Sequence, residues 1–252
     1  MNEPTINEKW AGGSACKSMN THFYSTDLEK QYEKHKSKKK TRDLLEKNGW
    51  LHKNQITYTF NSHGFRSEEF NDVEILFNGC SHTLGVGLPI EQIWSKKVAD
   101  YFDVKYHSLA MAGSDNVFMA QRSVFWIPKL KPKYYVVQES FRERFNWWGP
   151  DLDNPTKVEM QTTGALGYTQ IDRSILDMSS HRENYEWHYY CFRHIIEKIC
   201  KQHNVKLIVL SDDRMAKINN PDLDLARDLQ HRGQKENQKF ARVVVDKIKK
   251  LA

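Results

Sequence analysis

Hydrophobic positions along this chain repeat with two different periods, which replace one another in a regular order. Short β-branched and apolar runs, typical of buried strands, are followed by longer segments with apolar residues at helical spacing. We expect strands at 56–60, 73–77, 104–108, 134–138 and 205–210, and helices at 90–102, 116–127 (ended by Pro128), 185–203 and 234–250. Strands that alternate with helices of this length predict an α/β fold, a three-layer αβα sandwich with a parallel sheet in the middle.

Residues 1–55 do not share this alternation, because they are polar and lack a strong period. Within them, 27–47 has the composition of a charged helix, for which Ser25 or Thr26 is the expected cap. We therefore interpret 1–55 as an N-terminal extension, packed on or tethered to a main domain of residues 56–252.

A second irregular stretch, residues 142–184, lies inside the main domain and shows no clear period. Loops of this length in a compact domain are usually functional or disordered. We interpret the stretch as an insertion that forms a lid or a substrate wall. Its Trp147 and Trp148 can stack on a sugar ring, although anchoring a loop is the commoner role of such a pair.

A serine follows the first strand of the predicted βα alternation, in the sequence Asn78-Gly79-Cys80-Ser81. Parallel sheets bind ligands at the carboxyl ends of their strands. A serine in a sharp turn there exposes its hydroxyl and can aim its own N–H at a substrate oxygen, which acyl transfer requires. A glycine-rich connector with a capping serine has the same pattern, and Cys80 is a rival nucleophile that we rank below Ser81. Neither phosphate-loop spacing, GxxxxGK[ST] or GxGxxG, is present.

An aspartate and a histidine stand three positions apart before the last predicted helix, at Asp228 and His231. One irregular turn lets the carboxylate accept the Nδ1 proton and leaves Nε2 to take the proton of a serine. Such pairs are often structural, but this one follows the last strand and so lies on the same edge as Ser81. Asp224 can replace Asp228 only with a different loop shape.

Other side chains with possible chemistry have weaker claims. His63 and His82 lie near the predicted crevice and are candidate substrate contacts, whereas His188 and His194 lie on a predicted helix. Without disulfide or zinc spacing, we expect reduced thiols at Cys16, Cys80, Cys191 and Cys200. We expect no metal and no cofactor, because the sequence has no HExxH, EF-hand loop or Cys/His cluster.

Together, these blocks resemble the SGNH/GDSL hydrolase family, and most of all its divergent members encoded by bacteriophages. That family has a serine block after the first strand, an oxyanion glycine after the second, an asparagine after the third and a DxxH block before the last helix. Residues 79–81 match the first block with Cys80 in place of the usual aspartate, Gly113 matches the second, and 228–231 match the fourth. The resemblance spans 56–250, including a lead-in at 58–66.

The third block departs from the family pattern. Gln138 is followed by Glu139 and Ser140, so the oxyanion asparagine is missing at this strand end. Asn116, Gln138 and Ser140 are the candidates for a second oxyanion donor beside Gly113, and we choose Asn116. Because the loss of one such donor typically costs about 10²–10³ in rate, catalytic activity itself is in question.

The resemblance implies a flavodoxin-like SGNH hydrolase fold and hydrolysis of carboxylic esters through Ser81, His231 and Asp228. An esterase or an O-deacylase fits, with small-molecule esters and acylated carbohydrates as substrates. The alternative is a catalytically inactive binding or structural protein of a virion that kept the fold, since fold does not guarantee function.

The chain of 252 residues has a formal net charge of +6, and much of the excess lies in residues 34–42. This segment is a weak indication of nucleic-acid binding, because a solvated face is the usual role of such a run. The sequence has no apolar run near the roughly 18 residues of a membrane helix and no N-terminal signal. We therefore expect no membrane contact, and a place in the host cytoplasm or a virion; the oligomeric state is not predicted.

Overall fold

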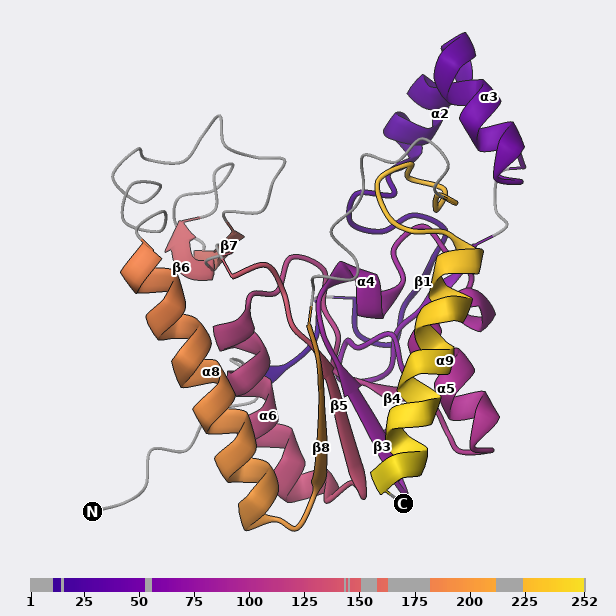
Figure 1. The fold of residues 1–252 in the computed structure, drawn as a ribbon. Coiled ribbons are helices and arrows are strands. Elements are labelled where there is room, and N and C mark those ends of the chain that lie inside the picture. The colour runs from indigo at the N-terminus through magenta and orange to yellow at the C-terminus, as the bar shows by residue number, and fades with distance from the viewer. Residues whose placement is uncertain are drawn as a thin grey trace.

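Four parallel strands form the sheet at the centre of the molecule, in the order β4-β3-β5-β8 (Figure 1). The strands are β3 (Ile75–Asn78), β4 (His107–Ser108), β5 (Tyr134–Gln138) and β8 (Lys206–Leu210). This computed structural model describes residues 11–14, 16–52, 56–142, 144, 146–150, 158–162, 182–211 and 224–251. Because the strands are parallel, their carboxyl ends meet at one edge of the sheet, and the predicted α/β class is confirmed.

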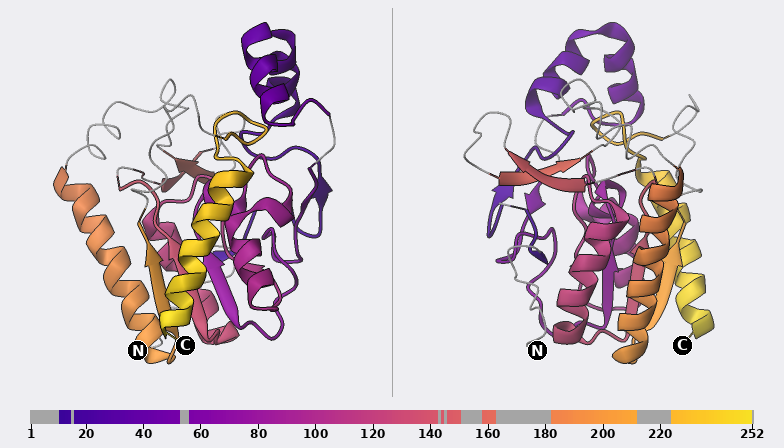
Figure 2. Two further views of the ribbon diagram at one scale, coloured as in Figure 1. Left: turned by 45° about the vertical axis from the view of Figure 1, so that its right-hand side comes forward. Right: turned by 90° about the vertical axis from the view of Figure 1, so that its left-hand side faces the viewer.

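Two pairs of helices cover the two faces of this sheet (Figure 2). The first pair is α5 (Trp94–Tyr101) and α9 (Gln234–Leu251), and the second pair is α6 (Asn116–Leu130) and α8 (Arg182–Gln202). On β3, Ile75 and Phe77 belong to the core cluster of the first pair, whereas Leu76 belongs to that of the second. Successive strand side chains point to opposite faces, so the unbroken apolar run of β3 is buried on both sides of a three-layer sandwich.

Two predicted helix boundaries are wrong. Helix α6 continues through Pro128 and ends at Leu130. In the last turn a proline removes only one helical hydrogen bond, and its fixed φ suits a helix. The predicted helix 90–102 is divided into a 3-10 turn, η1 (Ile90–Gln92), and α5, because Ile93 between them is extended.

The predicted strand at 56–60 is short and lies outside the main sheet. Only Tyr58–Thr59 (β2) is a strand, and it pairs antiparallel with Asn20–Thr21 (β1). The partner of β2 therefore comes from the N-terminal part of the chain. The two strands lie nearly 40 positions apart, and no local sequence pattern predicts their pairing.

The charged helix expected at 27–47 is two helices, α2 (Glu29–Ser37) and α3 (Lys39–Lys47), separated by an extended Lys38. Neither Ser25 nor Thr26 caps it: Leu28 occupies the N-cap position of α2 without a side-chain hydrogen bond. The Thr26 hydroxyl instead donates to Asp228.

Residues on both sides of the predicted boundary at position 55 share one core. Tyr32, Leu45 and Trp50 are buried in the same cluster as β3, α5 and α9. The Trp50 indole N–H donates to the carbonyl of Leu225, at 2.8 Å. The N-terminal residues are therefore packed on the sheet domain, close to the loop that holds Asp228. The division into an extension and a domain at this position stays a prediction.

The insertion expected at 142–184 contains an antiparallel pair of strands, β6 (Asn146–Pro150) and β7 (Val158–Thr162). Most of the remaining insertion lies outside the described residues, and so do the side chains of Trp147 and Trp148. The lid, wall and stacking roles stay predictions. Among the helices described, none has the length and apolar character that a membrane crossing needs.

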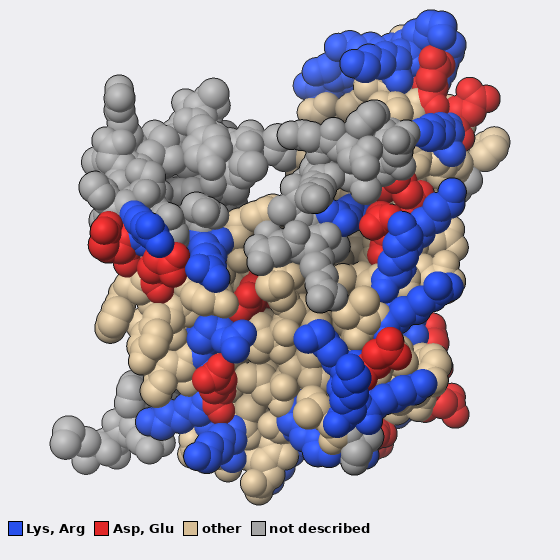
Figure 3. Space-filling model, viewed as in Figure 1, with Lys and Arg blue, Asp and Glu red and all other residues tan. Residues whose placement is uncertain are grey.

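One dense group of positive charge covers the two N-terminal helices. Lys and Arg side chains crowd over α2 and α3, the helices that stand above the carboxyl edge of the sheet (Figure 3). Their ion pairs, such as Lys39 with Asp43, are exposed to solvent. Exposed pairs contribute little to stability, so these ion pairs add little to the stability of the fold.

Candidate active site

The turn after β3 places Ser81 at the carboxyl edge of the sheet. Ser81 is the first residue of a short helix, α4 (Ser81–Leu84), and Cys80 before it is extended. Gly79 is required for this turn, because a Cβ atom there would lie 2.0 Å from Thr83 Oγ1. Cys80 is 1% exposed and packs in the core cluster of α6 and α8. The turn therefore presents the serine hydroxyl and buries the rival thiol.

A buried arginine holds the segment after Ser81 through hydrogen bonds to its backbone. Arg66, in the lead-in segment, donates to the carbonyl oxygens of Leu84, Gly85 and Leu88 at 3.1, 2.8 and 2.9 Å. On the sheet side, Thr83 Oγ1 donates to Gln138 Oε1 at 2.8 Å. Helix α4 is therefore fixed from two sides. Sequence reasoning marked the lead-in but assigned no role to Arg66.

The structure brings Ser81, His231 and Asp228 into one hydrogen-bonded chain. Ser81 Oγ lies 2.8 Å from His231 Nε2, and His231 Nδ1 lies 2.6 Å from Asp228 Oδ2. The other carboxylate oxygen accepts the backbone N–H groups of Gln230 and His231, at 3.1 and 3.0 Å. This local turn, in which Leu229 takes a φ of 57°, aims both side chains of the DxxH block at the serine.

The side chain of Asp228 is held in its ionised form. Burial raises the pKa of Asp228, but the charge and hydrogen bonds of His231 and the Thr26 hydroxyl outweigh it and bring that pKa down to about 2. At neutral pH a carboxylate therefore faces Nδ1, which favours the tautomer with a free lone pair on Nε2. That is the tautomer able to accept the proton of Ser81 Oγ.

A second histidine packs against the first. The rings of His82 and His231 lie 4.8 Å apart, centre to centre. Burial lowers the pKa of His82 well below its usual value, and the nearby His231, Arg144 and Arg232 lower it further. His82 is therefore neutral near pH 7 and adds no charge beside the base. Its role as a substrate contact stays a prediction, whereas His63 stacks on Phe70.

The loop after β4 and the start of α6 carry the predicted oxyanion residues. Met111 N–H donates to the Gly79 carbonyl at 3.2 Å, which places this loop beside the nucleophile turn. Gly113 follows two residues later with a φ of 77°, and its carbonyl accepts from Asn146 Nδ2 at 3.2 Å. This φ favours a glycine, and Gly113 as oxyanion donor stays a prediction.

Asn116 connects two strand ends. Its Nδ2 donates to the Ser140 carbonyl at 3.2 Å, and its Oδ1 accepts the Ser140 N–H at 2.8 Å. The amide thereby joins the loop after β4 to the loop after β5, which is a bracing role. Its predicted role as a donor to an oxyanion stays a prediction. Gln138, another candidate, has a fully buried side chain.

Two contacts of the Asp228 loop were missed by sequence reasoning. Thr26 Oγ1 donates to Asp228 Oδ2 at 2.7 Å. The next residue, Asp27, forms a buried ion pair with Arg227 at 2.7 Å. Both partners lie about 200 residues away in the chain, so no motif spacing could have revealed them.

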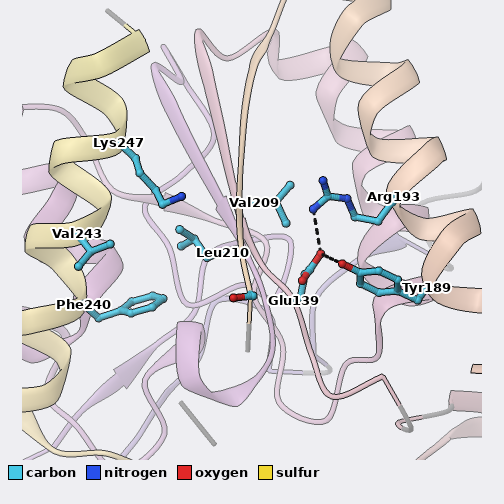
Figure 4. A pocket seen from close by; sticks show the side chains of 9 residues that line it. Glu139, Tyr189, Arg193, Val209, Leu210, Phe240, Val243 and Lys247 are labelled. Atoms are coloured by element: carbon cyan, nitrogen blue, oxygen red, sulfur yellow. Dashed lines mark hydrogen bonds and ion pairs between the residues drawn. The ribbon is translucent and has the colours of Figure 1, made fainter. Parts of the chain in front are cut away.

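A cavity of about 190 Å³ lies where β8 ends between α8 and α9 (Figure 4). Glu139 lines it and accepts from Tyr189 Oη at 2.9 Å and from Arg193 Nη1 at 3.0 Å. Lys247 reaches toward the same space from α9. Ser81, His231 and Asp228 do not line this cavity. Across the described ranges, no three His, Cys, Asp or Glu side chains gather in a way that could hold a metal ion.

No protein-family model matches this sequence, and no curated protein matches it. Among solved structures, the chain is similar to a psychrotrophic esterase, EstA, from Pseudoalteromonas sp., with 14% identity over 71% of this chain and 98% of that one and a TM-score of 0.40. It is also similar to a Clostridium thermocellum family 3 carbohydrate esterase, with 14% identity, 71% and 98% coverage and a TM-score of 0.36. A putative acylhydrolase from Bacteroides fragilis matches with 9% identity, 83% and 96% coverage and a TM-score of 0.35. Likenesses this remote carry no argument about activity, which has to be argued from the geometry of the site.

Proposed function

We propose that this protein is a serine hydrolase of carboxylic esters, in which Ser81 is the nucleophile, His231 the general base and Asp228 the orienting carboxylate. One observation carries the proposal, a continuous chain of hydrogen bonds through the three side chains. Ser81 Oγ lies 2.8 Å from His231 Nε2, and His231 Nδ1 lies 2.6 Å from Asp228 Oδ2. The first distance is within the reach needed for proton transfer, and the second is that of a hydrogen bond that orients the imidazole.

The reaction follows from these contacts. His231 Nε2 takes the hydroxyl proton as Ser81 Oγ attacks the ester carbonyl, and Asp228 stabilises the imidazolium that forms. The Ser81 and Gly113 backbone N–H groups are the proposed donors to the oxyanion. The imidazolium then protonates the leaving alcohol. A water molecule, deprotonated by the same histidine, hydrolyses the acyl-enzyme and restores the serine.

The substrate class rests on the family resemblance, which implies O-acyl groups on small alcohols or on carbohydrates. The test uses p-nitrophenyl acetate and butyrate with purified wild type, Ser81→Ala and the matched surface control Ser37→Ala. We expect Ser81→Ala to lose activity by a factor on the order of 10³ or more and Ser37→Ala to keep it. Equal hydrolysis by wild type and Ser81→Ala would overturn the assignment.

A second candidate is a binding or structural protein that kept the fold without the chemistry. The Asn116–Ser140 contacts favour it, because the chosen replacement for the third-block asparagine is engaged in bracing two loops. A fluorophosphonate probe separates the two candidates. Covalent labelling of wild type that disappears in Ser81→Ala supports the hydrolase, and a folded wild type that is not labelled supports the binding protein.

A further inference from the structure

The carboxylate of Asp228 is shared between the histidine and the N-terminal segment. Oδ2 accepts from His231 Nδ1 at 2.6 Å and from Thr26 Oγ1 at 2.7 Å. Oδ1 accepts from two backbone N–H groups of its own turn, Gln230 and His231. Among the donors that the described residues supply, Thr26 is thus the one that comes from another part of the chain, 202 positions away.

Thr26 is held at this place by the residue that follows it. Asp27 is 1% exposed, and its two oxygens accept from Arg227 Nε at 3.0 Å and Nη2 at 2.7 Å. Arg227 directly precedes Asp228. The pairs Thr26-Asp27 and Arg227-Asp228 therefore lie side by side, joined by hydrogen bonds from both members of each pair.

A third element completes this arrangement. The Tyr58 hydroxyl donates to Asp27 Oδ2 at 2.6 Å and accepts the Gly87 N–H at 2.8 Å. The Gly87 carbonyl in turn accepts the Arg227 N–H at 2.9 Å. The position of Thr26 is therefore fixed relative to the loop after α4 as well as to the loop of Asp228.

We propose that Thr26 is a positioning residue of the Ser81–His231–Asp228 chain, so that the N-terminal segment belongs to the catalytic apparatus. A carboxylate can rotate about its Cβ–Cγ bond, and rotation would move Oδ2 away from Nδ1. The two backbone N–H groups on Oδ1 oppose that rotation from one side, and the Thr26 hydroxyl on Oδ2 opposes it from the other and keeps the imidazole aimed at Ser81. The proposal rests on the proposed function for its effect on rate, and on geometry alone for its effect on His231.

The test removes the hydroxyl with little change of shape. Thr26→Val keeps the branched side chain, Thr26→Ser keeps the donor, and Thr59→Val is the matched control at the exposed position of β2. In ester hydrolysis we expect Thr26→Val to lower kcat by about tenfold, the size of a charge-assisted hydrogen bond. We expect KM to stay within about twofold, since the interaction does not touch the substrate. Thr26→Ser should recover most of kcat, and Thr59→Val should match wild type.

A double-mutant cycle distinguishes positioning from general support of the fold. In an Asp228→Asn background the carboxylate is gone, and Thr26→Val should then change kcat by less than about twofold. A full tenfold loss in that background, or wild-type kcat in Thr26→Val itself, would overturn the proposal. If Thr26→Val does not fold, as judged by thermal melting, Thr26→Ala takes its place in the same measurements.

A readout without turnover separates this proposal from the proposed function. In Ser81→Ala protein, the low-field NMR signal of the His231 Hδ1 proton reports the bond to Asp228. We expect that proton to exchange faster with water, and its signal to move upfield, on adding Thr26→Val but not Thr26→Ser. If no ester is hydrolysed but this response is seen, the proposed function fails and the positioning role stands. An unchanged signal overturns the positioning role even in an active enzyme.

Discussion

Arg227 and Asp27 form an ion pair in the interior of the protein, with Nη2 and Oδ2 2.7 Å apart although 200 residues separate them in the chain. Both side chains are almost fully inaccessible to solvent, at 0% and 1% exposure. An ion pair in this position connects the first part of the chain to the loop that holds Asp228. It makes folding of the two parts interdependent.

Removal of one partner of this pair should therefore be costly. We expect Asp27→Asn to lower the free energy of unfolding by about 3–5 kcal/mol, because the guanidinium of Arg227 is left buried without its counter-charge. Urea denaturation at neutral pH measures the change. The matched control is Asp43→Asn, which breaks the exposed pair with Lys39 and should cost less than about 1 kcal/mol. Equal small effects in the two variants would contradict the buried character of the Asp27–Arg227 pair.

Acid should destabilise the protein in part through Asp228. The pKa of this carboxyl falls from an ordinary 3.8 to about 2 on folding, so its stabilising contribution is complete above about pH 4 and is lost as the pH falls through about 2. The contribution is about 2 kcal/mol. We expect Asp228→Asn to flatten the dependence of unfolding free energy on pH between 4 and 2 by that amount, measured with urea. Asp246→Asn, on the exposed side of α9, should keep the wild-type slope.

His82 should make the stability of the protein depend on pH in a higher range than Asp228 does. Its pKa is depressed on folding, so the unfolded chain binds a proton that the folded protein excludes. Stability should therefore decrease as the pH falls below about 6.5, the ordinary pKa of histidine. We expect His82→Phe to reduce this slope between about pH 6.5 and 5, in thermal melts followed by circular dichroism. The exposed His194→Gln is the control, and a slope that survives in His82→Phe would assign the effect to another group.

Gly79 offers a test of the nucleophile turn by packing. A Cβ atom at this position would lie 2.0 and 2.7 Å from Thr83 Oγ1 and Cβ, so α4 would have to shift. We expect Gly79→Ala to destabilise the protein by about 1–3 kcal/mol and to reduce fluorophosphonate labelling of Ser81. Gly49→Ala is the control, because Gly49 has a φ of 79° and a Cβ atom added there would meet nothing within 4 Å. That variant should lose some stability to backbone strain and label like wild type.

The βα alternation could be predicted because strands buried on both faces leave a continuous apolar signal in the sequence. β5, for example, is buried at all five positions and was expected with the observed bounds. The boundary at Pro128 was wrong because one proline late in a helix removes a single hydrogen bond and does not stop the chain from continuing. The helix expected at 27–47 was divided at Lys38, where the two helices pack on each other rather than continue.

In the site, too, local relationships could be predicted from the sequence and contacts between distant segments could not. The short spacing of Asp228 and His231 allowed their turn to be predicted, because a local turn sets their relation. The Thr26 hydroxyl and the pairing of β1 with β2 depend on contacts between distant segments, which carry no periodicity. The bracing of Asn116 by Ser140 is also of this kind, since two loops from separate strands have to meet before either residue has a partner.

Arg66 anchors α4 through acceptors that belong to the backbone, so a mutation can remove the donor of these hydrogen bonds but not their acceptors. The oxygens that receive its hydrogen bonds belong to the backbone at Leu84, Gly85 and Leu88, and a carbonyl persists whatever residue is substituted there. An exchange of charges between the two partners, which can preserve a salt bridge, would therefore not restore these hydrogen bonds. Substitution of Arg66 should therefore remove all three hydrogen bonds at once, whereas substitution of Leu84 or Leu88 acts through packing, and substitution of Gly85 also meets the strain of a φ of 78°.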